Sequence, residues 1–429
     1  MDKCGFLDFM WSLGECGSIS VELLPKGQYR IVERGVRIEG ATADLSHCVI
    51  EDTQTGQRIK GDAKINAKSS DWRTQGTIDD SCYDNVVLHI VEECDTVLLR
   101  ANASVVVTCV ITATEPLREA FERLPLQCGK IWAELHPVKR ADILSRLLDD
   151  RIKRKIAEMK ALIDTNDGTW NDHCHILFFR GMGTPSGNKD EFEQIARHIN
   201  YDFILIHKSH QRYIEGVLLG SIGYLEMEED SMDQYTKKLR EEYILSKDLL
   251  GENTLLANWS KEPCRPTSAP ALSLIQAITI LVKRPGLFRD IFIVESLGEL
   301  RNLFRVELPE YWQSHSAPSA GLGISSPMFT TQRIDILLLN FVIPLLLLKA
   351  KLDDDMELWH RAFDYYEQIE AERFSLLRRW SSQAWRPCSA YDSQALVQLH
   401  QQYCKGGMCG SCMVGREGLL SLCKCAEGG

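Results

Sequence analysis

The chain has 429 residues, of which 44% are hydrophobic and 25% charged, and its formal net charge is −11. A chain of this length exceeds what one hydrophobic core usually serves, so we expect two or three domains. The negative charge argues against a protein that coats nucleic acid through an overall positive field, although a local basic groove is compatible with it.

Residues 20–113 have the pattern of β-strands. β-branched residues and period-two alternation dominate segments such as VELLPKGQYRIVERG, GDAKINAK and SVVVTCVI. The run VVLHIV at 86–91 is apolar on both faces apart from His89, which is typical of a central strand. We therefore predict a β-rich N-terminal domain over residues 1–115.

After Pro116 the apolar residues recur at spacings of three and four, which indicates amphipathic helices. This pattern covers segments such as 141–163, 231–249 and 356–380. We therefore predict a large all-helical domain over residues 116–400, a cysteine-rich tail over 401–429, and an α+β fold for the whole chain.

The most apolar run is IDILLLNFVIPLLLL at 334–348. It is shorter than the roughly 20 residues that a membrane-spanning helix needs, and it contains Asp335, Asn340 and Pro344. We interpret it as a buried helix that bends or ends near Pro344. Because the N-terminal residues also lack the long apolar stretch of a signal peptide, we expect a cytoplasmic protein that does not associate with membranes.

The C-terminal cysteines differ from the others in their spacing. The sequence YCKGGMCGSC places Cys404, Cys409 and Cys412 in a C-x4-C-x2-C pattern with glycines between them. Glycine lets the backbone curl so that several sulfurs meet, and thiolates at this spacing can hold zinc or an iron–sulfur cluster. Cys423 and Cys425 are local candidates for a fourth ligand. The alternative is a loose tail of reduced thiols.

Several distinctive sequence blocks occur in a fixed order along the chain. They are KSSDW (68–72), CYDNVVLHIV (82–91), YIEGVLLGSIGYLE (213–226), LPEYWQSH (308–315), DSQALVQLHQQYC (392–404) and the C-x4-C-x2-C tail. Together these blocks resemble an uncharacterised bacterial family, domain of unknown function family 2851. The resemblance runs over nearly the whole length, and the same order of blocks argues against a chance match. The family label carries no established activity. The resemblance also implies Cys128, in LPLQCGK, as the favoured fourth ligand of the cysteine site.

The family pattern has an aspartate on one strand and Glu-x-His on the next, which is similar to the core of PD-(D/E)XK nucleases. In such a core, converging carboxylates bind a hard divalent cation, and the metal lowers the pKa of a bound water. Here Asp44 matches the aspartate, but Lys64 replaces the glutamate and Asn66 the histidine, while Gln75 and Thr77 replace a following His-x-His pair. The resemblance therefore implies a nuclease-related scaffold with a decayed active site, acting in nucleic-acid or partner binding.

Two alternatives stay open at this point. Asp62-Ala63-Lys64 is itself a D-x-K sequence, so Asp44, Asp62 and Lys64 could form a shifted catalytic site of an active, Mg²⁺-dependent nuclease. The other alternative is a solvated strand face in a structural or interaction protein with no nucleic-acid role. A basic cleft around Lys64 would favour nucleic-acid binding, a trio of carboxylates would favour catalysis, and a mixed surface would favour neither.

Basic residues elsewhere are candidates for phosphate contacts. Lys68 follows the D-x-K strand, and the run Arg151-Ile152-Lys153-Arg154-Lys155 lies in a predicted helix. We take Lys68, Arg151, Lys153 and Arg154 as candidate nucleic-acid contacts, with a solvated helix face as the alternative for the three helical residues.

Overall fold

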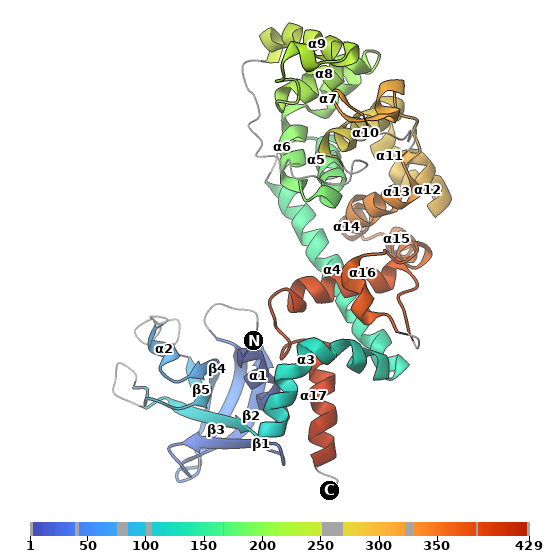
Figure 1. Ribbon diagram of the computed structural model, residues 1–429. Helices are drawn as coiled ribbons and strands as arrows, with labels where there is room; N and C mark the ends of the chain where they lie inside the picture. Colours follow the sequence, from blue (N-terminus) through green and yellow to red (C-terminus); the bar gives the residue numbers. More distant parts are fainter. Residues whose placement is uncertain are drawn as a thin grey trace. The chain divides into compact units, whose positions relative to one another are not determined.

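A computed structural model describes residues 3–38, 43–74, 85–99, 105–165, 167–250, 269–321, 329–382 and 385–426 (Figure 1). The chain forms two compact units. Unit 1 consists of Met1–Leu148, Arg373–Cys388 and Asp392–Gly429, and unit 2 consists of Asp149–Glu372 and Ser389–Tyr391. The predicted α+β architecture is confirmed, with a six-stranded sheet in unit 1 and a helical region after it.

The sheet of unit 1 has the strand order β1-β6-β5-β4-β3-β2. β4 runs parallel to β5 and β5 parallel to β6, whereas the remaining neighbours are antiparallel. The predicted central position of 86–91 is confirmed, because β5 pairs on both sides. The strands are β1 (Ile19–Leu24), β2 (Tyr29–Arg37), β3 (Leu45–Asp52), β4 (Arg58–Lys68), β5 (Val86–Glu93) and β6 (Val107–Ala113).

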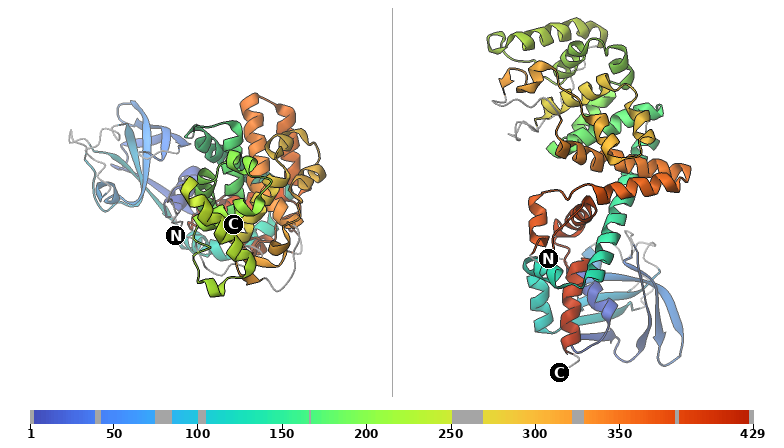
Figure 2. Two further views of the ribbon diagram at one scale, coloured as in Figure 1. Left: turned by 90° about the horizontal axis from the view of Figure 1, so that it is seen from above. Right: turned by 90° about the vertical axis from the view of Figure 1, so that its right-hand side faces the viewer.

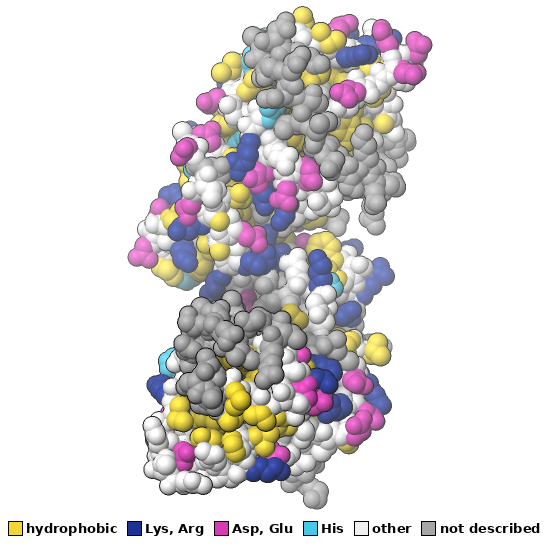
Figure 3. All heavy atoms as spheres, turned by 90° about the vertical axis from the view of Figure 1, so that its left-hand side faces the viewer, with side chains coloured by type: hydrophobic (Ala, Val, Ile, Leu, Met, Phe, Trp, Pro, Cys, Tyr) yellow, Lys and Arg dark blue, Asp and Glu magenta, His cyan; other side chains and the backbone are white. Residues whose placement is uncertain are grey.

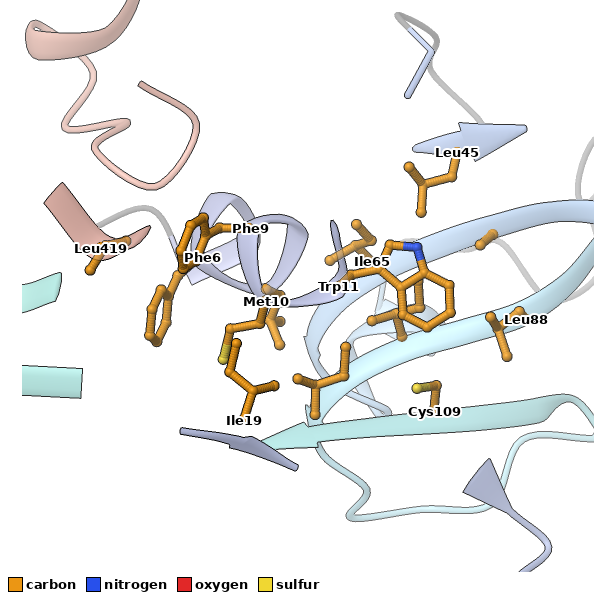
Figure 4. Packing of buried hydrophobic residues seen from close by; sticks show 14 of the residues in the cluster. Phe6, Phe9, Met10, Trp11, Ile19, Leu45, Ile65, Leu88, Cys109 and Leu419 are labelled. Carbon is orange, nitrogen blue, oxygen red and sulfur yellow. The ribbon is translucent and has the colours of Figure 1, made fainter. Parts of the chain in front are cut away.

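One face of the sheet packs against α1 (Lys3–Leu13), as Figure 4 shows. Phe9, Met10 and Trp11 of this helix are buried and belong to the same apolar cluster as Ile65 and Leu88 of the sheet. Strand alternation explains the arrangement, because Ala63 and Ile65 face this core while Asp62, Lys64 and Asn66 point to the other face. That opposite face carries the predicted site.

The C-terminal residues complete unit 1. α17 (Met413–Ala426) packs along α3 (Glu115–Glu134), as Figures 1 and 2 show. Leu419 of α17 is fully buried and belongs to the core that α1 and the sheet form (Figure 4). Arg416 of α17 pairs with Asp8 of α1, with 3.0 Å between Nη1 and Oδ2. The predicted division into domains 1–115, 116–400 and 401–429 stays a prediction. The remaining helices that contain residues of unit 1 are α2 (Asp71–Thr74), α4 (Pro137–Asp164) and α16 (Ala390–Leu399).

In the part of unit 2 that the structure describes, the regular elements are helices and one small hairpin, β7 (His315–Ala317) with β8 (Ala320–Gly321). Its helices, besides the C-terminal part of α4, are α5 (Trp170–Gly183), α6 (Lys189–His198), α7 (Tyr201–Ile206), α8 (Gln211–Ser221), α9 (Gln234–Leu250), α10 (Pro270–Lys283), α11 (Leu287–Ile293), α12 (Leu297–Phe304), α13 (Thr331–Leu337), α14 (Ile343–Asp353) and α15 (Met356–Gln368).

The apolar run 334–348 is buried in unit 2, as predicted. The helix type changes just before Pro344, because α13 passes into a π-helical segment at Leu338–Val342 and α14 begins at Ile343. The predicted bend at Pro344 stays a prediction. Among the described residues, no single helix has the length and apolar content that crossing a membrane requires, and only α10 and α11 together pass that criterion, with a bend of 76° between them.

Candidate functional site

Asp44 and Lys64 lie side by side on the outer face of the sheet. Leu45 of β3 pairs with Ala63 of β4, and both side chains belong to the core. Asp44 precedes Leu45 and Lys64 follows Ala63, so strand alternation places both of them on the opposite face of the sheet. The Lys64 Nζ is 3.3 Å from the Asp44 Oδ2, and the same oxygen accepts the backbone N–H of Ile65 at 2.8 Å. The aspartate that a nuclease-like core would offer to a metal is thus occupied by a lysine and a backbone amide.

Asp62 has a different set of partners. Its Oδ2 accepts a hydrogen bond from the Asn85 side-chain amide at 2.9 Å, and its backbone N–H donates to the Asn85 carbonyl at 2.8 Å. Lys64 thus pairs with Asp44, whereas Asp62 is hydrogen-bonded to Asn85, the residue before β5. Sequence reasoning missed Asn85, although it lies inside the block CYDNVVLHIV. The catalytic role of the three residues stays a prediction.

Asn66 and His89 form a buried polar pair on the same face. The His89 Nε2 donates to the Asn66 Oδ1 at 3.0 Å, and the imidazole makes an edge contact with Trp72, with ring centroids 4.8 Å apart. His89 is fully buried, and burial lowers its pKa to about 4. Among the described residues its Nδ1 has no hydrogen-bond partner. The imidazole is therefore neutral near pH 7.

The block KSSDW builds the turn that follows β4. The Ser69 and Ser70 hydroxyls donate to the Asp95 carboxylate at 2.8 and 2.7 Å, and these hydrogen bonds lower the pKa of Asp95 to about 2. The Asp71 Oδ2 accepts the backbone N–H of Lys68 at 2.9 Å. The turn places Trp72 in a small apolar cluster on the outer side of the sheet. Gln75 and Thr77, the other two replaced positions, lie outside the described residues.

The candidate nucleic-acid contacts lie beside acidic groups or in the interior. The Lys68 Nζ is 2.8 Å from Glu93, whose hydrogen bond raises the pKa of the lysine, and in unit 2 Lys153 and Arg154 each pair with an acid on their own helix at 2.6 Å. Arg151 is buried, which lowers its pKa. The proposed phosphate contacts stay predictions.

Lys155 belongs to the same basic run but was not among the candidate contacts. Its Nζ donates to the Asn340 Oδ1 at 2.9 Å, and burial, with a contribution from Arg151, lowers its pKa to about 7. Asn340 belongs to the π-helical segment, which departs from regular helical geometry where it meets α4. No periodicity of α4 could have indicated this contact, because the partner is 185 residues away in the chain.

Two blocks of the family resemblance meet around Glu215 in unit 2. The carboxylate is fully buried and accepts hydrogen bonds from the Trp312 indole at 2.7 Å, the Tyr235 hydroxyl at 2.8 Å and the Gln211 amide at 3.0 Å. Burial raises the pKa of Glu215. YIEGVLLGSIGYLE thus supplies the acid and LPEYWQSH one of its donors. This network joins α8, α9 and the segment before β7.

The predicted cysteine ligands all belong to unit 1. Cys128 lies on α3, Cys404 ends the π-helical segment His400–Cys404, and Cys412 directly precedes α17, with Cys409 in the loop between. Across the described residues, no three His, Cys, Asp or Glu side chains are arranged so that they could hold a single metal ion. Neither a magnesium site at the sheet nor a zinc site at the cysteines is therefore assembled there.

A family model with the description "Protein of unknown function (DUF2851)" matches residues 5–375. The chain belongs to this family. The matched range includes Asp44, Lys64, Glu215 and Trp312, and it ends before the C-terminal cysteines. Comparisons with curated proteins and with solved structures gave no significant match. Membership in DUF2851 therefore identifies the relatives of the chain without assigning it an activity.

Proposed function

We propose that the sheet of unit 1 is a nuclease-related scaffold that has lost its metal chemistry and now acts in binding a protein partner. The observation that carries this proposal is the ion pair between Lys64 and Asp44, at 3.3 Å. A hard divalent cation needs several oxygen ligands with net negative charge, and here an ammonium group already neutralises the carboxylate. The Asp62 carboxylate has a partner of its own, because it accepts a hydrogen bond from the Asn85 side-chain amide.

The local charges favour a protein over a nucleic acid as the partner. Phosphate binding needs cations that can neutralise the backbone, but Lys64 and Lys68 both pair with carboxylates. Hydrophobic side chains also gather on the surface of this unit (Figure 3), and Val36, Val97 and Leu99 are among its exposed apolar residues. Exposed apolar patches are typical of protein-binding surfaces.

Cleavage assays test the loss of chemistry. Purified protein with Mg²⁺ or Mn²⁺ should cleave neither DNA nor RNA above the background of a preparation that carries Asp62→Ala. The physical reason is the absence of a carboxylate at position 64, where the lysine would repel a cation. Metal-dependent cleavage that Asp62→Ala abolishes would overturn the proposal and favour an active nuclease with Asp44, Asp62 and Lys64.

A restoration experiment tests whether the scaffold once held a metal. Lys64→Glu would place a second carboxylate beside Asp44, so we expect it to bind Mn²⁺ measurably by calorimetry, whereas the wild-type protein should not. Lys60→Glu makes the same change of charge on the same strand, away from Asp44, and should bind no more Mn²⁺ than the wild type. Equal Mn²⁺ binding by the two variants would refute a nuclease-like arrangement of this face.

Nucleic-acid binding is the outcome that would change the partner class. Fluorescence anisotropy with labelled DNA and RNA at about 50 mM and about 200 mM salt separates the cases, because phosphate contacts weaken steeply with salt. We expect no binding at either concentration. Binding that falls with salt, and falls further in Lys68→Ala, would replace the protein partner by a nucleic acid.

A further inference from the structure

β1 and β2 of unit 1 are consecutive strands that do not pair with each other. Only residues 25–28 separate them, and antiparallel strands joined by so short a connection ordinarily form a hairpin. In this sheet the two strands instead stand at opposite ends of the strand order, where β1 pairs with β6 and β2 with β3. The sheet therefore curls until these two edge strands face one another, and we call the gap between them the seam.

A cavity of about 330 Å³ opens at the seam. Both strands line it, β1 with Val21 and Leu23 and β2 with Tyr29 and Ile31. These four side chains pack against the core that α1 and the sheet form, but they are only half-buried. The apolar core of unit 1 is thus incomplete along the seam, and covering these side chains with further apolar groups would be favourable.

The end of α1 fixes the β2 side of the seam. The Trp11 indole N–H donates to the Arg34 carbonyl at 2.9 Å. The Arg34 guanidinium donates to the Trp11 carbonyl and lies over the indole ring, 5.0 Å from its centroid. Trp11 itself is buried in the core. Because β2 is held to this helix and not to β1, the seam belongs to the packing of unit 1.

Both edges of the seam carry backbone hydrogen-bonding groups. In an antiparallel pair, every second residue directs its N–H and C=O away from the partner strand. Within the described residues β1 has no strand partner besides β6, and β2 has none besides β3, so these groups of both strands border the seam. An unpaired strand edge is a template for a further strand, and here two such edges flank one apolar floor.

The charges at the seam favour an occupant without net charge. Two acids, Glu15 and Glu22, and two bases, Lys26 and Arg34, line the cavity, so its charges balance. Lys26 forms an ion pair with Glu22, and Arg34 is bonded to the Trp11 carbonyl. Both cations that line the cavity thus have partners, which disfavours a phosphate backbone and favours an uncharged peptide.

We propose that an extended segment of a partner protein inserts between β1 and β2 as a further strand of the sheet. Its backbone hydrogen-bonds both edges, and every second side chain is apolar and enters the cavity beside Leu23 and Tyr29. The side chains between them face solvent. This inference rests on the protein-binding role proposed for the sheet, and it adds where the partner binds and in which conformation.

Selection of random displayed peptides of about ten residues, the length of a long strand, on the full chain supplies the probes. The recovered peptides should have apolar residues at alternate positions. They should slow amide hydrogen exchange in β1 and β2, whereas β4, which is paired on both sides, should not change. The tightest peptide, N-methylated at alternate residues, keeps its side chains but loses backbone donors, so it should bind about tenfold more weakly or worse.

Two variants of the protein locate the binding site. Leu23→Asp places a carboxylate in the cavity and should weaken the binding of the same peptide by about tenfold or more. Ser20→Asp makes the same change of charge at an exposed position of β1 and should leave the affinity unchanged. If Leu23→Asp does not fold, the comparison of the two peptides on the wild-type protein still decides.

Four results would overturn the inference. Equal affinity of the N-methylated peptide would make the cavity a site for an apolar ligand and not for a strand. Slow exchange in β1 and β2 that depends on protein concentration without peptide would make a second copy of the chain the occupant. Peptides that protect the face around Lys64 instead would move the site within the sheet, and recovery of no peptide that protects β1 and β2 would remove it.

The last two results leave the proposed protein-binding role of the sheet standing. That role fails separately, through salt-dependent binding of DNA or RNA or through metal-dependent cleavage. The two failures are therefore distinguishable, because one is measured with peptides at the seam and the other with nucleic acids.

Discussion

At the scale of single residues, His89 has the clearest dependence on pH. Its pKa is about 4 in the folded protein because of burial, and about 6.5 in the unfolded chain. Between these values the unfolded state binds the proton more strongly, so the stability of the folded state falls as the pH decreases from 6.5 to 4. The shift corresponds to about 3 kcal/mol.

Urea unfolding at pH 7.5 and at pH 4.5 measures this effect. The wild-type protein should lose more stability on acidification than His89→Gln, which removes the titrating group. His136→Gln changes an exposed histidine of the same unit and should follow the wild type. Equal pH dependence of the wild type and His89→Gln would show that the buried imidazole does not resist protonation.

Lys155 should make the stability of the folded protein depend on pH above neutrality. Its pKa is about 7 in the folded protein because of burial, and about 10.4 in the unfolded chain. Between these values the unfolded state binds the proton more strongly, so the stability of the folded state rises as the pH increases from 7 towards 10. Urea unfolding at pH 7 and at pH 9 should therefore show a larger gain for the wild type than for Lys155→Met, whereas Lys153→Met, at an exposed position of the same helix, should follow the wild type. Equal gains in the wild type and Lys155→Met would contradict the lowered pKa.

The sequence could predict some of these residues and not others, for a physical reason. Asp44 and Lys64 follow from strand alternation, because period two fixes the face of each residue once two strands pair. Asn85, Asp95 and Asn340 act through loops or through contacts between distant segments, and no local pattern encodes those contacts. The neutral state of His89 depends on burial, which the apolar character of the run 86–91 indicates in part.

At the scale of elements, the strands were easier to predict than the ends of the helices. The helical pattern of 356–380 continues beyond Gln368, but α15 ends there and Ile369 is extended. The Ile369 carbonyl accepts the backbone N–H of Ala390 at 2.7 Å, and Glu370 pairs with Ser389 in an isolated bridge. A partner from later in the chain thus ends the helix, which spacing of apolar residues cannot reveal.

The Glu215 network should stabilise the packing of α8 and α9 in unit 2. Trp312→Phe keeps an aromatic ring but removes the indole N–H, so the buried carboxylate loses one of its donors and the free energy of unfolding should fall by about 2 kcal/mol. Tyr365→Phe, which removes a hydrogen bond to the neutral Glu295 carbonyl, should cost about 1 kcal/mol.

Denaturant unfolding of the single variants and of the double variant Glu215→Gln/Trp312→Phe measures the coupling. The double variant should be more stable than the sum of the two single losses predicts, because a neutral amide needs the indole donor less than a carboxylate does. If the two losses in the free energy of unfolding simply add, the side chains of Glu215 and Trp312 have no coupling energy, and the prediction is wrong.

At the scale of the whole molecule, the last residues should stabilise the first. Leu419 is fully buried in the core of α1 and the sheet, so Leu419→Ala should lower the stability of unit 1 by about 3 kcal/mol. Hydrogen exchange should then become faster in α1, more than 400 residues earlier, whereas Ser421→Ala, at an exposed position, should leave it unchanged. Unchanged exchange in α1 after Leu419→Ala would contradict a shared core.

This division of unit 1 along the chain has a consequence for biosynthesis. A ribosome releases the sheet and α1 first, then all of residues 149–372, and only afterwards α17. Domains generally fold as units while the chain emerges. Unit 2 can therefore fold before unit 1, whose core stays open on the side that Leu419 later closes. The apolar core of unit 1 is therefore incomplete, and exposed to aggregation, for most of the synthesis of the chain. A chaperone that binds exposed apolar residues would act on the chain during this period.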